Sequence, residues 1–128
     1  MTIYLSVPQV LNLHEDLVGA FGGALATRER GSLEAAVARP TATFGGEELY
    51  PDVAAKAAAL MHSLVLNHPF IDGNKRTAYV ALEFFLALNG VKFPVGDAEA
   101  VVMMVAMASG EATDAEFIAW VRRHAMAP

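Results

Sequence analysis

Residues 68–77 read His68-Pro69-Phe70-Ile71-Asp72-Gly73-Asn74-Lys75-Arg76-Thr77. Before this stretch, the apolar residues of segment 53–67 recur at the spacing of a packed helix. Pro69 predicts that this helix ends near Asn67, because the residue before a proline is pushed out of the α-helical region. After the stretch, residues 74–88 leave little polar face and end at an Asn-Gly pair, so they predict a central, buried helix. The quoted residues therefore form a short loop that leads from one core helix into another.

The start of the second helix carries the residues of an anion site. Lys75 and Arg76 fall in its first turn, where the backbone amides lack partners and the helix dipole already favours negative charge. Gly73 allows a ligand to approach the backbone closely, and Asn74 could cap the helix or donate to an oxyanion. Two cations and free amides that converge on one point favour a bound phosphate.

The loop itself adds groups that phosphoryl transfer needs. His68 can act as a base near neutral pH, and Asp72 is a hard oxygen ligand suited to a Mg²⁺ ion that bridges phosphates. Each residue also has a purely structural alternative: a histidine beside proline at a helix end, a solvated Lys-Arg pair and an Asp-Gly turn. The spacing alone leaves both interpretations open.

Further helices are predicted on both sides of this pair from their caps and stops. They are a helix capped by Ser6 and ending at Phe21, a short one capped by Ser32 and ending near Arg39, one capped by Asp97 and ending near Ser109, and a last one opened by Thr113 and Glu116. Residues 41–50 are predicted as a loop, and strands are nearly absent. The fold class is therefore all-α, with five to seven helices in a single domain over residues 1–128.

Composition excludes several classes of protein. The chain has 128 residues, 55% hydrophobic and 18% charged, which is enough apolar content for a core and excludes a disordered chain. It has no cysteine, so disulfides and thiolate metal sites are excluded and a reducing, cytoplasmic location is expected. The net charge of −5 argues against direct nucleic-acid binding. The longest uncharged run, residues 57–71, is shorter than the roughly 20 apolar residues of a membrane span, so no membrane contact is expected.

The quoted stretch resembles the Fic/Doc family. The Fic branch carries His-Pro-Phe-x-x-Gly-Asn-Gly-Arg-x-x-Arg, and the Doc (death on curing) branch carries His-x-Phe-x-Asp-x-Asn-Lys-Arg; residues 68–76 match every fixed Doc position. The chain departs from the Fic form at Lys75, where Fic has its second glycine, and at Tyr79, which stands where the final arginine would be. The likeness extends over about residues 4–124.

This resemblance implies a compact helical bundle with the motif loop and the following helix at its centre. It also implies a bacterial toxin of a type II toxin–antitoxin module, restrained in trans by a Phd-like antitoxin. The expected activity is that of a Ser/Thr protein kinase that transfers the γ-phosphate of ATP to a translation factor, expected to be elongation factor Tu, and so arrests translation. By carry-over from the motif, His68 is the base, Asp72 holds Mg²⁺, and residues Gly73, Asn74, Lys75 and Arg76 bind the nucleotide phosphates.

Two other functions remain open. The first is a Fic-type transfer of AMP or another nucleotide part to a protein hydroxyl. Lys75 disfavours it because its side chain fills the room that the Fic glycine leaves for the phosphates, and Tyr79 disfavours it because the last Fic arginine, a phosphate contact, is missing there. The second is a catalytically idle helical module that only binds an antitoxin, which the intact set of His68, Asp72, Lys75 and Arg76 argues against.

Other residues have less specific predictions. Phe44, Gly45 and Gly46 fall where the family has a flap that aligns the target peptide, although Phe44 could instead be tucked into the core of an ordinary loop. His14 lies on an apolar stripe and is predicted as a core histidine. Arg28 is predicted to pair with a neighbouring glutamate rather than to approach a nucleotide.

Overall fold

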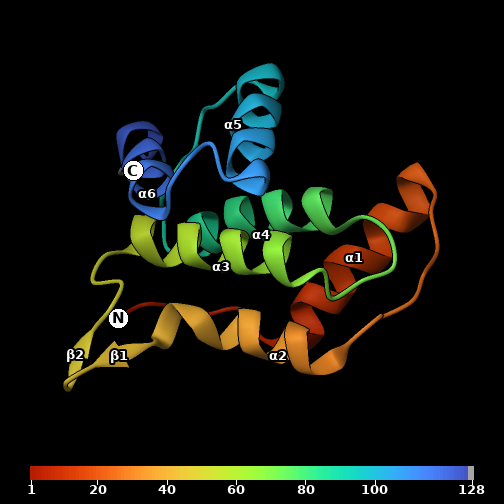
Figure 1. Ribbon diagram of the computed structural model, residues 1–128, viewed down its shortest axis with the longest axis horizontal. Coiled ribbons are helices and arrows are strands. Elements are labelled where there is room, and N and C mark those ends of the chain that lie inside the picture. The colour runs from red at the N-terminus through yellow and green to blue at the C-terminus, as the bar shows by residue number, and fades with distance from the viewer. Residues whose placement is uncertain (127–128) are drawn as a thin grey trace.

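Two helices joined by the motif loop form the centre of the molecule in the computed structural model, which describes residues 1–126 (Figure 1). The last two residues of the predicted 1–128 domain lie outside that range. Six α-helices occur within it: α1 (Val7–Phe21), α2 (Arg30–Ala38), α3 (Val53–Asn67), α4 (Asn74–Leu88), α5 (Asp97–Ser109) and α6 (Asp114–His124). They are joined by a short 3₁₀ helix, η1 (Arg39–Thr41), and by a hairpin of β1 (Thr43–Phe44) and β2 (Glu47–Glu48). The all-α prediction is confirmed.

The central pair can pack on several sides because its side chains are small or apolar. Asp52 caps α3 by accepting a hydrogen bond from the backbone amide of Ala55 at 2.7 Å. Buried alanines on α3 and α4 let neighbouring helices approach closely: α2, α5 and α6 contact α3, and α1 contacts α4. The prediction of a central helix after the motif is therefore confirmed. The loop itself lies at one end of the pair, with several side chains exposed to solvent.

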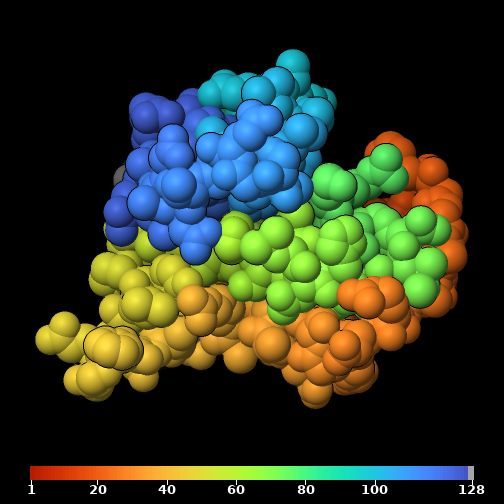
Figure 2. Space-filling view, in the orientation of Figure 1, coloured from red at the N-terminus to blue at the C-terminus, as the bar shows by residue number. Residues whose placement is uncertain are grey.

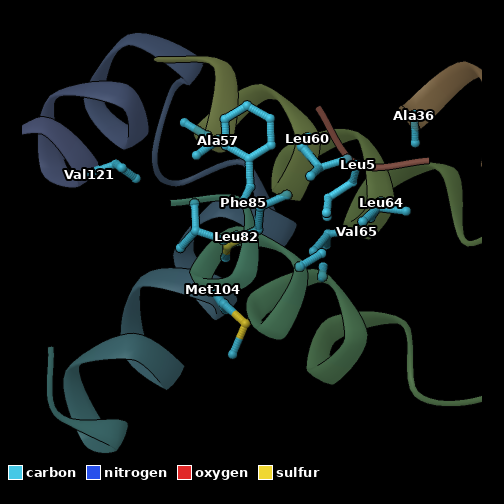
Figure 3. Packing of buried hydrophobic residues seen from close by; sticks show 14 of the residues in the cluster. Leu5, Ala36, Ala57, Leu60, Leu64, Val65, Leu82, Phe85, Met104 and Val121 are labelled. Carbon is cyan, nitrogen blue, oxygen red and sulfur yellow. The ribbon is translucent and has the colours of Figure 1, made fainter. Parts of the chain in front are cut away.

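One apolar core joins all the helices (Figure 3). Its centre is made by side chains of α3 and α4, and the last two helices each add residues to the same cluster. Among them are Leu60, Leu64, Val65, Leu82, Phe85, Met104 and Val121. Since burial of one large apolar side chain is worth roughly 1.5–3 kcal/mol, this shared core is what holds the two sides of the motif loop in place.

Several local boundaries differ from the sequence prediction. α2 begins at Arg30, so Ser32 lies inside the helix and does not cap it; the backbone amide of Glu29 is already fixed by the carbonyl of Pro69, and the helix starts directly after that contact. α5 is preceded by Gly96 as its cap residue, and Asp97 is its first helical residue. An acidic side chain in a first turn is favourable without being the cap.

The predicted loop 41–50 contains the hairpin. Gly45 and Gly46 both have positive φ, 62° and 85°, which is the geometry of a tight two-residue hairpin turn. The hairpin projects from the body of the molecule beside the start of α3 (Figures 1 and 2). α3 has 15 residues and is thus about 22 Å long, so the hairpin and the motif loop lie at opposite ends of the molecule.

Candidate active site

Buried side chains anchor the motif loop while its charged side chains stay in solvent. Pro69, Phe70 and Asn74 are buried, and His68 and Asp72 are exposed. The side-chain amide of Asn74 holds both polar groups of the Phe70 backbone: its Oδ1 accepts from the Phe70 amide at 3.0 Å, and its Nδ2 donates to the Phe70 carbonyl at 2.9 Å. Asn74 therefore neither caps α4 nor offers its side chain to a phosphate, and only its backbone amide is left for that purpose.

The segment between α1 and α2 forms a strand-like cover over this loop. Thr27 and Phe70 form an antiparallel bridge, and the amide of Ile71 donates to the carbonyl of Ala26 at 3.1 Å. Further on, the amides of Arg28 and Glu29 both donate to the Pro69 carbonyl, at 2.7 and 3.1 Å. The backbone of the loop is thus fixed by residues about 40 positions earlier in the chain.

Arg28 holds the backbone of the predicted base. Its guanidinium donates to the carbonyl oxygens of His68 at 2.8 Å and Asn67 at 3.0 Å. His68 has a φ of 46°, the only positive φ of a non-glycine residue within the described range, and such a conformation costs free energy unless its surroundings fix it. The prediction that Arg28 pairs with a glutamate is therefore wrong: its guanidinium instead satisfies the carbonyls at the C-terminal end of α3, where the helix dipole also favours a cation.

The predicted site residues are brought together in one open pocket of about 530 Å³, within the size range of small-molecule sites. Its lining includes all six of them, His68, Asp72, Gly73, Asn74, Lys75 and Arg76. Phe21, Gly22 and Gly23, at the end of α1, complete the wall. Sequence reasoning treated these three residues only as a helix end, and the pair of adjacent glycines was the sole local signal that the backbone comes close to something there.

The floor of the pocket is the start of α4. Gly73 has a φ of 79° and precedes the helix without a side-chain cap. In the described part of the chain, the amides of Gly73, Asn74, Lys75 and Arg76 donate no hydrogen bond. Lys75 and Arg76 extend from the same turn into solvent, and the Arg76 guanidinium lies 4.3 Å from the centre of the Phe21 ring. Free amides and two cations make this end of the helix suited to phosphate groups.

The Asp72 carboxylate is held at the edge of the pocket by the segment that follows α1. Its Oδ2 accepts a hydrogen bond from the amide of Ala24 at 2.9 Å. A Cβ atom on Gly23 would come within 3.2 Å of the Asp72 Cβ, so glycine is needed for this approach. No cluster of three or more metal-binding side chains occurs among the described residues. Mg²⁺ commonly uses one or two carboxylates together with substrate phosphates and water, so a single Asp72 fits Mg²⁺ that arrives with a nucleotide better than a metal held by protein alone.

His68 faces Asn74 at the mouth of the pocket. The second hydrogen on Asn74 Nδ2 points to His68 Nδ1 over 3.4 Å, which is long for a hydrogen bond. This is the side-chain polar contact that the His68 ring makes among the described residues, and the Asn74 amide on its other side is fixed by Phe70. Asn67 does not contribute to that orientation; its side chain donates to the Ser32 carbonyl at 3.1 Å.

A second, more apolar groove of about 510 Å³ adjoins the pocket. It shares Phe21, Lys75 and Arg76 with the pocket and continues along α5 over the side chains of Val101 and Val105. Tyr79, at the position of the last Fic arginine, lines this groove and not the pocket. Burial and, after it, the carboxylate of Glu83 raise the pKa of Tyr79 to about 12, so its phenol is neutral near pH 7.

The predicted docking residues are not brought to this site. Phe44 is 82% exposed at the tip of the hairpin beside Gly45 and Gly46, at the far end of α3. The alternative of a Phe44 tucked into the core is also excluded by that exposure. A docking role for the hairpin therefore stays a prediction, and it would require a target that extends along the length of α3.

Comparison with known proteins gives a consistent result. Residues 4–86 match the model of the Fic/DOC family. The chain is 51% identical over 92 residues to a protein named Toxin Doc from Mycolicibacterium smegmatis, covering 72% of this chain and 68% of that protein. It is 30% identical over 89 residues to Protein kinase doc of Escherichia phage P1, covering 70% of each chain. No helix in the described residues is both long and apolar enough to cross a membrane. By its motif, its helical fold and these matches, the chain belongs to the Fic/DOC family.

Proposed function

We propose that this chain is a toxin of a toxin–antitoxin module and acts as a protein kinase of the Doc type. The observation that carries the proposal is the convergence of an imidazole, a carboxylate, two cations and the unpaired amides of a helix start on one open pocket. The names of the two relatives, a toxin and a protein kinase, support the same assignment.

Each residue has one step in the proposed reaction. A ring nitrogen of His68 takes the proton of a Ser or Thr hydroxyl on the target protein, and the hydroxyl oxygen forms a bond to the γ-phosphorus as the bond to the leaving ADP breaks. Lys75, Arg76 and the amides of residues 73–76 bind the phosphate oxygens. Mg²⁺ held by Asp72 would supply positive charge between the phosphates when the nucleotide is bound.

Lys75 and Tyr79 favour transfer of the terminal phosphate. Lys75 places a long cationic side chain at the position where the Fic glycine leaves room for the nucleotide. Tyr79 replaces the Fic arginine with a neutral phenol that faces the neighbouring groove. Both changes depart from the phosphate-binding pattern of the Fic motif, so nucleotidyl transfer is the second candidate and rests on the match to the family as a whole.

The adjoining groove fits the antitoxin that a toxin requires. It is apolar along α5, where Val101 and Val105 are about half exposed, and it ends at Lys75 and Arg76. An amphipathic helix of a partner would bury these valines and, at the shared residues, also cover the phosphate pocket. A Val105→Lys variant should therefore escape neutralisation by the antitoxin while it retains phosphate transfer.

The test is a transfer assay with ATP labelled on either the α- or the γ-phosphate, Mg²⁺ and elongation factor Tu as the candidate target. Label from γ alone on a Ser or Thr residue supports the kinase proposal. Label from α would replace it with nucleotidyl transfer. Label from neither position, in elongation factor Tu or in a whole-cell lysate, would contradict both and favour a module that only binds its antitoxin.

A further inference from the structure

His14 reaches the motif loop from the interior of the molecule. It lies in α1 and is 2% exposed. Its ring stacks on that of Phe70, with centroids 3.8 Å apart and planes inclined by 5°. Its Nε2 lies 2.8 Å from the carbonyl oxygen of Asp72. The prediction of a core histidine is thus confirmed, but the polar contact connects the core to the loop that carries the charged residues.

This contact fixes both a tautomer and a peptide orientation. A carbonyl oxygen can only accept, so Nε2 of His14 carries the hydrogen and donates it. Because the peptide group is planar and trans, the Gly73 amide N–H points away from the Asp72 carbonyl and hence away from His14. That amide has no acceptor in the described chain, and Gly73 lines the phosphate pocket. The hydrogen bond inside the core therefore turns a backbone donor towards the ligand.

The opposite orientation of this peptide is open to the backbone. Gly73 has no Cβ and can change its backbone angles at little steric cost. A flipped Asp72–Gly73 peptide would direct a carbonyl oxygen at the phosphate and withdraw an amide donor. It would also leave the buried Nε2–H of His14 without an acceptor, and an unpaired buried donor destabilises that orientation. His14 is the group that makes one orientation preferred.

We propose that His14 is a positioning residue that holds the Asp72–Gly73 peptide in the orientation required for phosphate binding. It contacts neither the nucleotide nor the target, and acts through the backbone of the loop. The inference rests on the proposed phosphate chemistry of the pocket, and its test separates the two.

Three variants separate the effect of the His14 hydrogen bond from the effect of its packing. His14→Leu keeps an apolar side chain of similar volume and removes the donor, whereas His14→Gln places an amide donor near the position of Nε2. His62→Leu is the matched control, because His62 pairs with Asp114 at 2.8 Å on the other side of α3. Calorimetric titration with Mg²⁺ and a non-hydrolysable ATP analogue should give a Kd raised at least about 10-fold in His14→Leu. It should stay within about 3-fold of wild type in the other two.

Nuclear magnetic resonance gives a readout that needs no activity. In the wild type, the ¹⁵N shifts of His14 should show a hydrogen on Nε2 and a bare Nδ1, and this holds even if His14→Leu does not fold. The Gly73 amide signal should shift in His14→Leu without ligand and return towards its wild-type position in His14→Gln. Titration with inorganic phosphate should move that signal in the wild type and not in His14→Leu.

Three results would overturn the inference. They are an Nδ1-protonated His14, a Gly73 signal that is the same in folded His14→Leu and in wild type, and equal weakening of analogue binding in the Leu and Gln variants. Failure of the proposed function gives a different result, because the wild type would then not bind the ATP analogue. The ¹⁵N shifts of His14 and the response of the Gly73 amide to inorganic phosphate would still test the role of His14. A wild-type Gly73 signal that ignores phosphate would overturn both.

Discussion

Phe44 and Phe70 lie in loops at opposite ends of α3, and each loop contains a glycine with positive φ shortly after the phenylalanine. Phe44 is nevertheless 82% exposed, whereas Phe70 is 1% exposed. The hairpin around Phe44 is fixed to the body mainly through Lys56, a buried lysine that donates to Glu48 and to the Tyr50 carbonyl. The loop around Phe70 is held from three directions, by α1, by the segment before α2 and by the first residue of α4.

This difference shows what separates a functional loop from a connecting one in this fold. In the motif loop, the apolar side chain is buried so that the polar ones can be held at fixed positions in solvent. In the hairpin, backbone pairing is local and the apolar side chain is left exposed at the tip. A phenylalanine beside glycine occurs in both loops, and the distant partners of the backbone are what separate them in the structure.

The largest expected effect comes from removing the anchor of the motif loop. Phe70→Ala should lower the free energy of unfolding by about 3–5 kcal/mol, because it removes a fully buried ring and the surface on which His14 stacks. Phe44→Ala should change it by less than about 0.5 kcal/mol. Urea unfolding of both variants makes the comparison, and similar losses at the two positions would contradict it.

The next effect separates backbone positioning from stability. Arg28→Gln removes the charged donor from the carbonyls of His68 and Asn67. We expect the free energy of unfolding to fall by only about 1–2 kcal/mol, since the lost hydrogen bonds are exposed to solvent. We expect kcat to fall by about 10- to 100-fold, because the strained His68 backbone is no longer held in place. Arg30→Gln, two residues further on, is a suitable control. A kcat that stays unchanged in Arg28→Gln would show that the base does not need this support.

Lys56 tests the main anchor of the hairpin. Lys56→Met keeps the buried chain length and leaves the Tyr50 carbonyl without its donor, which should cost about 1–2 kcal/mol. Hydrogen exchange of the hairpin amides should accelerate. The Kd of the Mg²⁺–ATP analogue should stay the same, because His68 follows Lys56 by 12 residues, roughly 18 Å along α3. Weaker nucleotide binding in this variant would contradict the separation of the two ends.

The smallest expected effect is a dependence of the Tm on pH through Glu83 of α4. Burial and, after it, the carboxylate of Asp97 raise the pKa of Glu83 above its ordinary value of 4.5. A carboxyl that holds its proton more tightly when folded adds stability at low pH and loses it as the pH rises through the folded pKa. Glu83→Gln should therefore flatten the fall in Tm that begins as the pH rises past the ordinary glutamate pKa of 4.5. An identical dependence of Tm on pH in the variant and the wild type would show that folding does not raise the pKa of Glu83.

Local sequence signals were sufficient for most of the helices. The capping boxes of Ser6 with Gln9 and of Thr113 with Glu116 are present, and α4 spans the predicted residues 74–88. Such boxes act between residues three positions apart, so the sequence alone contains both partners. The wrong cap at Ser32 has the opposite cause, since the start of α2 is set by a backbone contact with the distant Pro69 carbonyl.

The same distinction applies to the site. His68, Asp72 and the residues up to Arg76 were predictable as one group because they are close in sequence, in one loop and the first turn of the helix that follows it. Arg28, Gly23 and the polar role of His14 were not, because their partners are about 40 to 60 positions away in the chain. Asn74 lines the pocket, but its side chain binds the backbone of Phe70, which the sequence did not predict.

The most direct test of the whole account is the initial rate of γ-phosphate transfer to the target protein in two histidine variants. His68→Ala should reduce the rate by about 10²–10⁴-fold, because it removes the proposed base from an otherwise unchanged pocket, while the Kd of the Mg²⁺–ATP analogue changes little. His62→Ala, at a histidine within α3 that pairs with Asp114 of α6, should leave the rate within about 2-fold of wild type. A His68→Ala variant that transfers γ-phosphate at the wild-type rate would contradict the assignment of this loop as the catalytic end of the molecule.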